Sequence, residues 1–345
     1  KKKNKDLNVK PQMIKDNLCI FINCLIDKPQ FSSQTKEELK SKSSNFGSEY
    51  TLSDKLIKKL ISFGLVEQII NFIKIKEELK IKSKVSGKKV NNIKGLPKLE
   101  DANNAGTKFS SNCCLILTEG DSAKTLAIAG RSVIGNDNYG VFPLKGKLLN
   151  VREASTKQQL GNEEIININK IMGLQMGKKY TNINDLRYGK ILIFTDQDDD
   201  GFHIQGLLIN YIHTYWPELL KLDIGFIVKL ATPVIRATKG KKILDFYNLL
   251  EYKKWEKTTK SNLWHIKYYK GLGTSNSTEA KEYFTDISKK LITYKWDIEY
   301  NDNGENLSDS FITLAFAKSK ANDRKTWILD DKDEETIDNN KKEIY

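Results

Sequence analysis

Residues 191–201 read ILIFTDQDDDG, and residues 113–123 read CCLILTEGDSA. Each stretch is a short apolar run, typical of a buried strand, that ends in acidic residues and a glycine. A third apolar run at 226–230 and helix-like segments at 122–129 and 203–221 complete an alternation of strands and helices. We therefore predict an α/β fold, a Rossmann-like parallel sheet with flanking helices. In such sheets ligands bind beyond the carboxyl ends of the strands, where both acidic ends are expected.

Three aspartates, Asp196, Asp198 and Asp200, alternate along the first stretch. In an extended segment residues two apart point to the same side, so we expect all three carboxylates to face one way. Like charges placed together are costly unless a cation neutralises them. Oxygen ligands without His or Cys favour Mg²⁺. Glu119 ends the other predicted strand and is expected to join this metal site, where it could also transfer a proton.

Two other interpretations of the aspartates stay open, an acidic surface turn and an Asp-rich calcium loop. A calcium loop needs a Glu several residues further on, whereas Phe202, His203 and Ile204 follow here. Gly201 is expected to let the backbone turn into the next helix. Behind Glu119, either Asp121 or Ser122 is expected to cap a helix.

The composition favours a polyanionic partner. The 345 residues include 57 basic and 44 acidic ones, a net charge of +13. Nucleic acid would suit this charge, although a solvated lysine surface explains it equally well. No apolar run approaches the roughly 18 residues of a membrane span, and we predict no membrane association. The four cysteines lack zinc-site spacing and are expected to be buried thiols in a reducing compartment.

The first part of the chain has a different texture. Ser53 is expected to cap a helix, and a second helix is predicted from residue 65 to about residue 84. Residues 86–108 are rich in Gly, Lys and Asn, which indicates a linker at a domain boundary. The chain begins without Met, so we expect a piece of a longer polypeptide.

Four motifs carry a family resemblance. Residues 117–123, LTEGDSA, and 195–201, TDQDDDG, resemble the two signature motifs of the TOPRIM domain. Residues 142–155, FPLKGKLLNVREAS, and 268–275, YYKGLGTS, resemble stretches particular to type IIA DNA topoisomerases. Within that family the chain looks most like the eukaryotic form, DNA topoisomerase II, and the resemblance can be followed over residues 8–330.

The resemblance implies a domain order. Residues 1–85 would be the C-terminal part of the α+β transducer of the ATPase region, and 86–108 a linker. Residues 109–290 would form the TOPRIM metal-binding domain with its extension. Residues 291–345 would connect to, and begin, a truncated winged-helix domain. The ATPase core is expected before residue 1, and the nucleophilic tyrosine after residue 345.

The resemblance also implies an activity. The whole enzyme would be an ATP-hydrolysing isomerase, a nuclear homodimer that makes and reseals a transient double-strand break for strand passage. Its partners would be double-stranded DNA and topoisomerase poisons at the cleavage site. Its cofactors would be Mg²⁺ and an ATP bound mainly outside this chain. Without the tyrosine, this chain alone is not expected to form a covalent DNA adduct.

Individual roles follow by matching motif positions. Glu119, Asp196 and Asp198 match Mg²⁺ ligands, Asp200 completes the motif, and Glu119 matches the proton donor or acceptor for the leaving 3′ oxygen. The DNA-facing positions are Lys147, Asn150, His203 and Lys270. The loop expected to reach the terminal phosphate of ATP is Gln34, Thr35 and Lys36.

The chain departs from the family pattern after TDQDDDG. The family usually has Ser-His-Ile-Lys there, whereas this chain has Phe202 and Gln205 at the first and last positions, a change expected to affect DNA or drug contacts. Tyr188 follows Arg187 and superficially resembles the catalytic Arg-Tyr pair, but its place before a predicted strand indicates a structural residue. The competing classes are another TOPRIM enzyme, such as a primase or an OLD-type nuclease, and a DNA- or drug-binding module without enzyme activity.

Overall fold

The computed structural model describes residues 10–47, 49–330 and 343–344. These fall into two compact units, Lys1–Lys80 and Ile81–Tyr345, each considered by itself. The helices of the first unit are α1 (Pro11–Lys15), α2 (Asp54–Ser62) and most of α3 (Leu65–Val85), and a short helical turn covers Ser43–Asn45. Ser53 caps α2 as predicted, because its side chain accepts a hydrogen bond from the Leu56 N–H at 3.3 Å.

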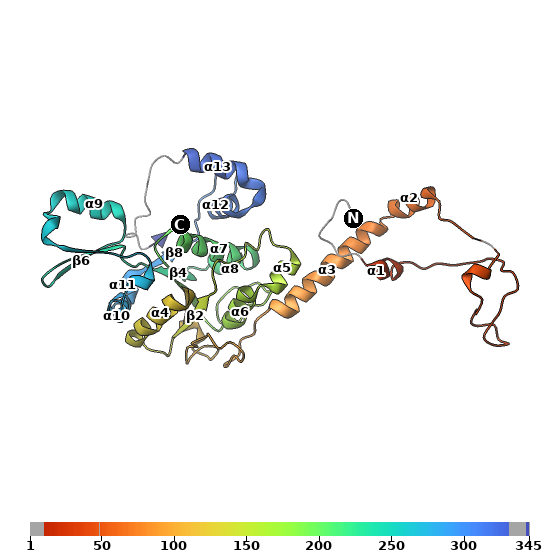
Figure 1. Cartoon of the computed structure of the whole chain (residues 1–345), viewed down its shortest axis with the longest axis horizontal. Coiled ribbons are helices and arrows are strands. Elements are labelled where there is room, and N and C mark those ends of the chain that lie inside the picture. Colours follow the sequence, from red (N-terminus) through yellow and green to blue (C-terminus); the bar gives the residue numbers. More distant parts are fainter. Residues whose placement is uncertain (1–9, 48, 331–342, 345) are drawn as a thin grey trace. The chain divides into compact units, whose positions relative to one another are not determined.

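The second unit is built on a mixed sheet (Figure 1). Among the described residues its strand order is β2-β1-β3-β4-β8-β9. The strands are β1 (Cys114–Glu119), β2 (Tyr139–Leu144), β3 (Lys190–Phe194), β4 (Ile227–Leu230), β8 (Leu291–Tyr294) and β9 (Glu343–Ile344). Strands β2, β1, β3 and β4 run parallel, β8 is antiparallel to β4, and β9 is parallel to β8. This confirms the predicted α/β class.

Helices cover both faces of this sheet. They are α4 (Gly120–Ile134), α5 (Thr156–Gly161), α6 (Glu163–Met172), α7 (Asp199–Tyr215), α8 (Pro217–Leu220), α10 (Ser277–Phe284) and α11 (Ile287–Lys290). Leu115 and Leu117 of β1 belong to a core with α6, α7 and α8, whereas Ile116 belongs to a second core with α4 and α10. Successive strand residues point to opposite faces, which explains why most residues of these strands are apolar on both faces of the sheet.

A smaller antiparallel sheet follows β4 along the chain. Its order is β6-β5-β7, with β5 (Ile235–Lys239), β6 (Lys242–Phe246) and β7 (His265–Tyr268). Helix α9 (Leu249–Thr258) packs on it, where Tyr252 and Trp255 join Phe246 in an aromatic cluster. Helices α12 (Leu307–Phe316) and α13 (Ala321–Asp330) lie near the end of the chain, and the remaining short helical turns are Ser110–Asn112, Ser261–Leu263, Leu272–Thr274 and Lys318–Lys320.

Residues 86–108, which the sequence predicts to be a linker, contain no helix and belong to the second unit, where they pack against its sheet. Glu100 pairs with Val141 of β2 through two backbone hydrogen bonds, and Ala102 and Ala105 are buried in the core. The cysteine prediction is half right: Cys113 and Cys114 are buried, whereas Cys19 and Cys24 are exposed. None of the helices that the structure describes combines the length and the hydrophobicity that a membrane span requires.

Candidate metal and nucleic-acid site

The acidic site lies where the strand order changes direction. The chain passes from β1 through α4 to β2 on one side, whereas β3 pairs with β1 on the other. Thr118 is in register with Phe194, so Glu119 and Asp196 leave neighbouring strands at the same edge. Ligands of open parallel sheets bind at such a point, and the structure places both acidic segments there, as predicted.

The local geometry corrects the expectation that all three aspartates face one way. The extended backbone ends at Asp198, and α7 begins at Asp199, so Asp200 lies in the first helical turn. Asp198 is the N-cap residue, and its Oδ1 accepts a hydrogen bond from the Gly201 N–H at 2.9 Å. A helix turns successive residues by about a third of a circle, so Asp200 no longer shares the direction of Asp196.

Asp200 instead contacts the loop that follows β2. Its Oδ1 lies 2.8 Å from Lys147 Nζ, and both side chains are exposed. This ammonium group holds the pKa of Asp200 below its ordinary value. An exposed pair of this kind contributes little stability, but it joins the basic loop to the acidic edge. Lys147 is therefore a direct neighbour of the acids, as its place in the motif suggested.

Glu119 is the member of the site whose environment is least satisfied. Its Oε2 is buried and has no hydrogen-bond partner among the described residues. Burial raises the pKa of the Glu119 carboxyl, and the negative charges of Asp196 and Asp198 raise it further. The backbone of Asp196 offsets part of this shift. A buried acceptor without a partner is uncommon in folded proteins and points to a missing cation, proton or water.

The helix behind Glu119 starts differently from the prediction. Helix α4 begins at Gly120, and Glu119 is the N-cap residue without a side-chain cap bond. Asp121 lies in the first turn and pairs with Lys98 at 2.6 Å, so neither Asp121 nor Ser122 caps the helix. The Glu119 carboxylate remains available to the sheet edge because it makes no cap bond.

A distant turn holds Asp196. The Leu272 N–H donates to Asp196 Oδ1 at 2.6 Å, from the motif YYKGLGTS. Gly271 before it has a φ of 76°, and a Cβ built there would lie 2.2 Å from Asp196 Oδ2. Glycine is required because the turn needs both a left-handed backbone and a close approach to a carboxylate. The Leu272 amide is therefore engaged with a carboxylate of the acidic site.

The other predicted DNA-facing residues divide into two groups. His203 and Lys270 are exposed, as DNA contacts require. The Asn150 side chain is engaged within the chain: its Nδ2 donates to the Phe316 carbonyl at 2.9 Å, and its Oδ1 accepts from Asn210 Nδ2 at 3.0 Å. The carboxylates are not gathered into a closed ligand shell either, since no three Asp, Glu, His or Cys side chains of the described residues are arranged to hold a metal ion.

In the first unit, Gln34 and Thr35 form a turn between Phe31 and Leu39, which pair in an antiparallel bridge. Lys36 completes the tip with a φ of 55°, and its N–H donates to the Ser33 carbonyl at 3.1 Å. All three residues of the predicted ATP loop are exposed. The loop thus presents an ammonium group at the end of a short hairpin.

Comparison with known proteins identifies the family. The family model for DNA gyrase B matches residues 1–88, the Toprim domain matches residues 114–229, and the C-terminal associated domain of TOPRIM matches residues 230–345. DNA topoisomerase 2-alpha of Gallus gallus is 51% identical over 333 residues, 95% of this chain and 21% of that protein. DNA topoisomerase 2 of Bombyx mori is 51% identical over 339 residues, 97% of this chain and 21% of that protein.

A solved structure agrees. The crystal structure of the Plasmodium falciparum topoisomerase II DNA-binding, cleavage and re-ligation domain superposes with a TM-score of 0.68 at 48% identity, and the match covers 74% of this chain and 34% of that one. The chain belongs to the type IIA DNA topoisomerase family. It spans about a fifth of the length of the curated relatives that it matches.

The two departures from the type IIA pattern lie beneath the acidic edge. Gln205 is 3% exposed; its Nε2 donates to Thr195 Oγ1 at 3.0 Å, and the Tyr294 hydroxyl donates to its Oε1 at 2.5 Å. Phe202 lies beside Lys229, whose Nζ is 5.5 Å from the ring centroid. Gln205 is thus an interior residue that joins α7 to β8.

The Arg-Tyr pair before β3 is structural, as predicted. Arg187 and Tyr188 are both fully buried, and the Tyr188 hydroxyl is hydrogen-bonded to Asp101 and to the Ala102 N–H. Burial raises the pKa of Tyr188 far above its ordinary value. A phenol that is fully buried and hydrogen-bonded on both sides has the environment of a structural residue.

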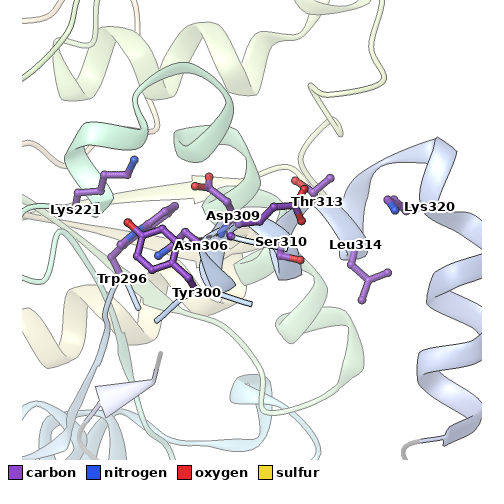
Figure 2. Close-up of a pocket in the computed structure, with 11 residues that line it drawn as sticks. Lys221, Trp296, Tyr300, Asn306, Asp309, Ser310, Thr313, Leu314 and Lys320 are labelled. Carbon is purple, nitrogen blue, oxygen red and sulfur yellow. Dashed lines mark hydrogen bonds between the residues drawn. The ribbon is translucent and has the colours of Figure 1, made fainter. Parts of the chain in front are cut away.

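A separate pocket of about 630 Å³ lies between the end of α8 and α12 (Figure 2). Trp296, Asp309 and Lys221 are among its lining residues, and none of the four acids is. Beside it, Arg152 Nη2 donates to His213 Nδ1 at 2.9 Å, which leaves the Nε2–H of His213 to donate to Asp309 at 2.7 Å. This network joins α12 to α7 and leaves Arg152 engaged within the chain.

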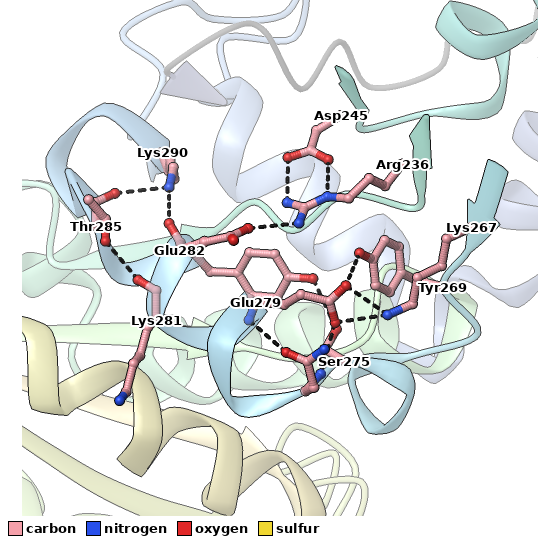
Figure 3. A network of polar contacts seen from close by, with 12 residues as sticks. Arg236, Asp245, Lys267, Tyr269, Ser275, Glu279, Lys281, Glu282, Thr285 and Lys290 are labelled. Atoms are coloured by element: carbon pink, nitrogen blue, oxygen red, sulfur yellow. Dashed lines mark hydrogen bonds and ion pairs between the residues drawn. The ribbon is translucent and has the colours of Figure 1, made fainter. Parts of the chain in front are cut away.

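The residue that sequence reasoning missed is Glu279 on α10. It is 8% exposed and binds the segment on both sides of the turn that holds Asp196 (Figure 3). A signal was available, because Asn276 followed three residues later by Glu279 is a capping-box pattern, and the structure shows that box complete.

Proposed function

We propose that this chain supplies the Mg²⁺-binding half of the DNA cleavage site of a type II DNA topoisomerase. The observation that carries the proposal is the buried Glu119 Oε2, which lacks a partner at an edge shared with Asp196 and Asp198. An all-oxygen site of this kind suits Mg²⁺. Glu119, Asp196 and Asp198 would hold the ion, with Asp200 at the rim beside Lys147.

The residues of the chain suit the cleavage step. In that step the hydroxyl of a tyrosine, expected from outside residues 1–345, gives its proton to solvent and its oxygen bonds to phosphorus, while the bond from phosphorus to the 3′ oxygen breaks. The leaving 3′ oxygen needs a proton, and the Glu119 carboxyl, at the same sheet edge as Asp196, is the group that would supply it. Bound Mg²⁺ would stabilise the negative charge that develops on the phosphate. Resealing is the reverse of this step, so it needs no ATP.

Exposed basic side chains would make the contacts with DNA and with the phosphates of ATP. Lys147, Lys270 and His203 are exposed and lie in the motifs near the acidic edge, so we assign them to the DNA backbone. Asn150 would shape the same loop, because its side chain is bonded to Phe316 and Asn210. The hairpin tip at Gln34, Thr35 and Lys36 would meet the terminal phosphate of an ATP bound elsewhere. A nuclear homodimer acting on double-stranded DNA, with poisons bound at the break, completes the proposal.

The decisive experiment uses a full-length enzyme that carries this chain, with Glu119→Gln. We expect Mg²⁺-dependent cleavage of supercoiled DNA to fall by a factor on the order of 10² to 10⁴, the usual contribution of a general acid or base. DNA binding, measured in the same buffer, should be unchanged. Glu218→Gln on α8 removes a carboxylate away from the acidic segments and serves as the matched control. Wild-type cleavage by Glu119→Gln would overturn the assignment.

A further inference from the structure

The turn that holds Asp196 is itself held from both ends by one carboxylate, that of Glu279. On the side before the turn, Lys267 Nζ lies 2.7 and 2.9 Å from the two Glu279 oxygens, and the Tyr269 hydroxyl donates to Oε1 at 2.6 Å. On the side after it, the Asn276 N–H donates to Oε2 at 2.8 Å. Figure 3 shows the Glu279 carboxylate beside Lys267 and Tyr269.

These contacts hold the residues at both ends of the turn in place. Glu279 is 8% exposed, and its own N–H donates to Asn276 Oδ1 at 2.9 Å, so carboxylate and backbone fix Asn276 together. Ser275 adds a contact of 3.0 Å to the Tyr283 hydroxyl, also on α10. The Gly271–Leu272 peptide therefore sits between two anchored flanks and has little room to move away from Asp196.

The charge of Glu279 matters to this arrangement. Burial by itself would raise the pKa of Glu279, but the hydrogen bonds from Lys267, Tyr269 and Asn276 outweigh it, and the pKa lies below its ordinary value. The group is therefore a carboxylate at neutral pH. Hydrogen bonds to an ionised acceptor are about twice as strong as neutral ones, so an uncharged replacement would loosen the anchors while keeping the shape.

We propose that Glu279 is a positioning residue that fixes the Leu272 amide on Asp196 and thereby orients Asp196 for cation binding. This inference rests on the proposed function of Asp196 as a ligand. Partners that orient metal ligands commonly change metal affinity by 10- to 100-fold when they are removed. The Leu272 amide binds Oδ1 of Asp196 and Gly271 packs against Oδ2, so the turn contacts both oxygens of this carboxylate.

A purely structural role would have a different signature. Lys267 and Tyr269 belong to β7 and its end, so Glu279 also ties the small sheet to α10. Glu282, one turn later on the same helix, does likewise through Arg236 at 2.7 Å, without touching the turn. Glu282→Gln is therefore a matched control, since it removes a charge from the same helix and the same tie between sheet and helix.

The experiment compares Glu279→Gln with Glu282→Gln in the whole 345-residue chain. Without metal, hydrogen exchange of the Leu272 amide in the whole chain is followed by NMR, or by mass spectrometry of a proteolytic peptide that covers residues 268–276. Mg²⁺ affinity is measured separately by calorimetry. For Glu279→Gln we expect Leu272 to exchange at least about 10-fold faster and Mg²⁺ to bind about 10-fold more weakly. Glu282→Gln should change neither value.

The inference is overturned if the two variants behave alike, or if Glu279→Gln lowers the melting temperature without affecting Leu272 exchange or Mg²⁺ affinity. Asp196→Asn separates this failure from failure of the proposed function. If Asp196→Asn binds Mg²⁺ like the wild type, the ligand assignment itself fails; if it binds more weakly and Glu279→Gln does not, only the positioning role fails. Should Glu279→Gln not fold, Tyr269→Phe removes one anchor and should shift both readouts in the same direction by less.

Discussion

The two ends of strand β3 carry two polar clusters of opposite character. Before the strand, Arg187 donates to the carbonyls of Val90 at 2.6 Å and Ile171 at 2.8 Å, and to Asp101 Oδ2 at 2.5 Å. After the strand, the Glu119 carboxylate of the neighbouring β1 keeps a buried oxygen without a partner among the described residues. We call the Arg187 cluster closed because its charged groups have partners, and the Glu119 cluster open because one of its buried oxygens has none among the described residues.

The difference separates structure from function. In a closed buried cluster each charge has its counterpart, and removing one partner is costly because it leaves the other charge buried and unpaired. An open cluster of like charges weakens the fold until a ligand arrives, which is the usual condition of a functional site. By this contrast the buried and fully hydrogen-bonded Arg187–Tyr188 pair is structural. Glu119, whose buried oxygen lacks a partner among the described residues, is instead a candidate functional residue.

Breaking the closed cluster should have the largest effect. Arg187→Met leaves Asp101 and three backbone carbonyls without their shared donor. We expect the free energy of unfolding to fall by about 3–5 kcal/mol, measured by urea denaturation. Lys178→Met, which breaks an exposed pair with Asp185, should cost no more than about 1 kcal/mol. Equal losses for both variants would show that the buried cluster is not a special support of the fold.

A substitution in the turn at Gly271, which follows β7 of the small sheet and contacts Asp196, should have an intermediate effect. Gly271→Ala places a Cβ 2.2 Å from Asp196 Oδ2 on a left-handed backbone. We expect a loss of roughly 1–2 kcal/mol in stability from the backbone alone, with weaker Mg²⁺ binding because Asp196 must move. Gly273→Ala is the control, since no heavy atom lies within 4 Å of its added Cβ. Gly271→Ala with wild-type stability and Mg²⁺ affinity would remove the turn from the site.

Relieving the open cluster should have the smallest effect, and of opposite sign. Without metal at pH 7, Glu119→Gln should raise the free energy of unfolding slightly, by about 0.5 kcal/mol, since the group is partly exposed. The raised pKa means that folded wild-type protein regains this loss as pH falls toward the ordinary glutamate value of 4.5. The difference in stability between Glu119→Gln and the wild type, followed by thermal melts, should therefore shrink as the pH falls. Glu37→Gln, which changes an exposed glutamate of the first unit, serves as the control. An advantage that grows would contradict the raised pKa.

Much of the larger sheet could be predicted from the sequence because β1 and β3 are short and mostly apolar. The predicted runs at 113–118 and 191–195 differ from β1 and β3 by one residue at each end. The small sheet was not predicted, since β6 and β7 carry mixed, half-exposed residues and depend on partners distant in sequence. The direction of Asp200 was missed because the capping role of Asp198 starts the helix early.

The contact between Asp196 and the Leu272 amide has a consequence for how the site comes into being. Glu119, Asp196 and Leu272 belong to three segments of the chain, separated by α4 to α6 and then by α7 to β7. Pairing β1 with β3 brings the first two together, and only the folding of the later sheet and α10 adds the third. In a partly folded chain Glu119 and Asp196 could thus lie side by side while Asp196 still lacked the contact with Leu272 that orients it. The proposed cation site would then be complete only after the small sheet and α10 have folded.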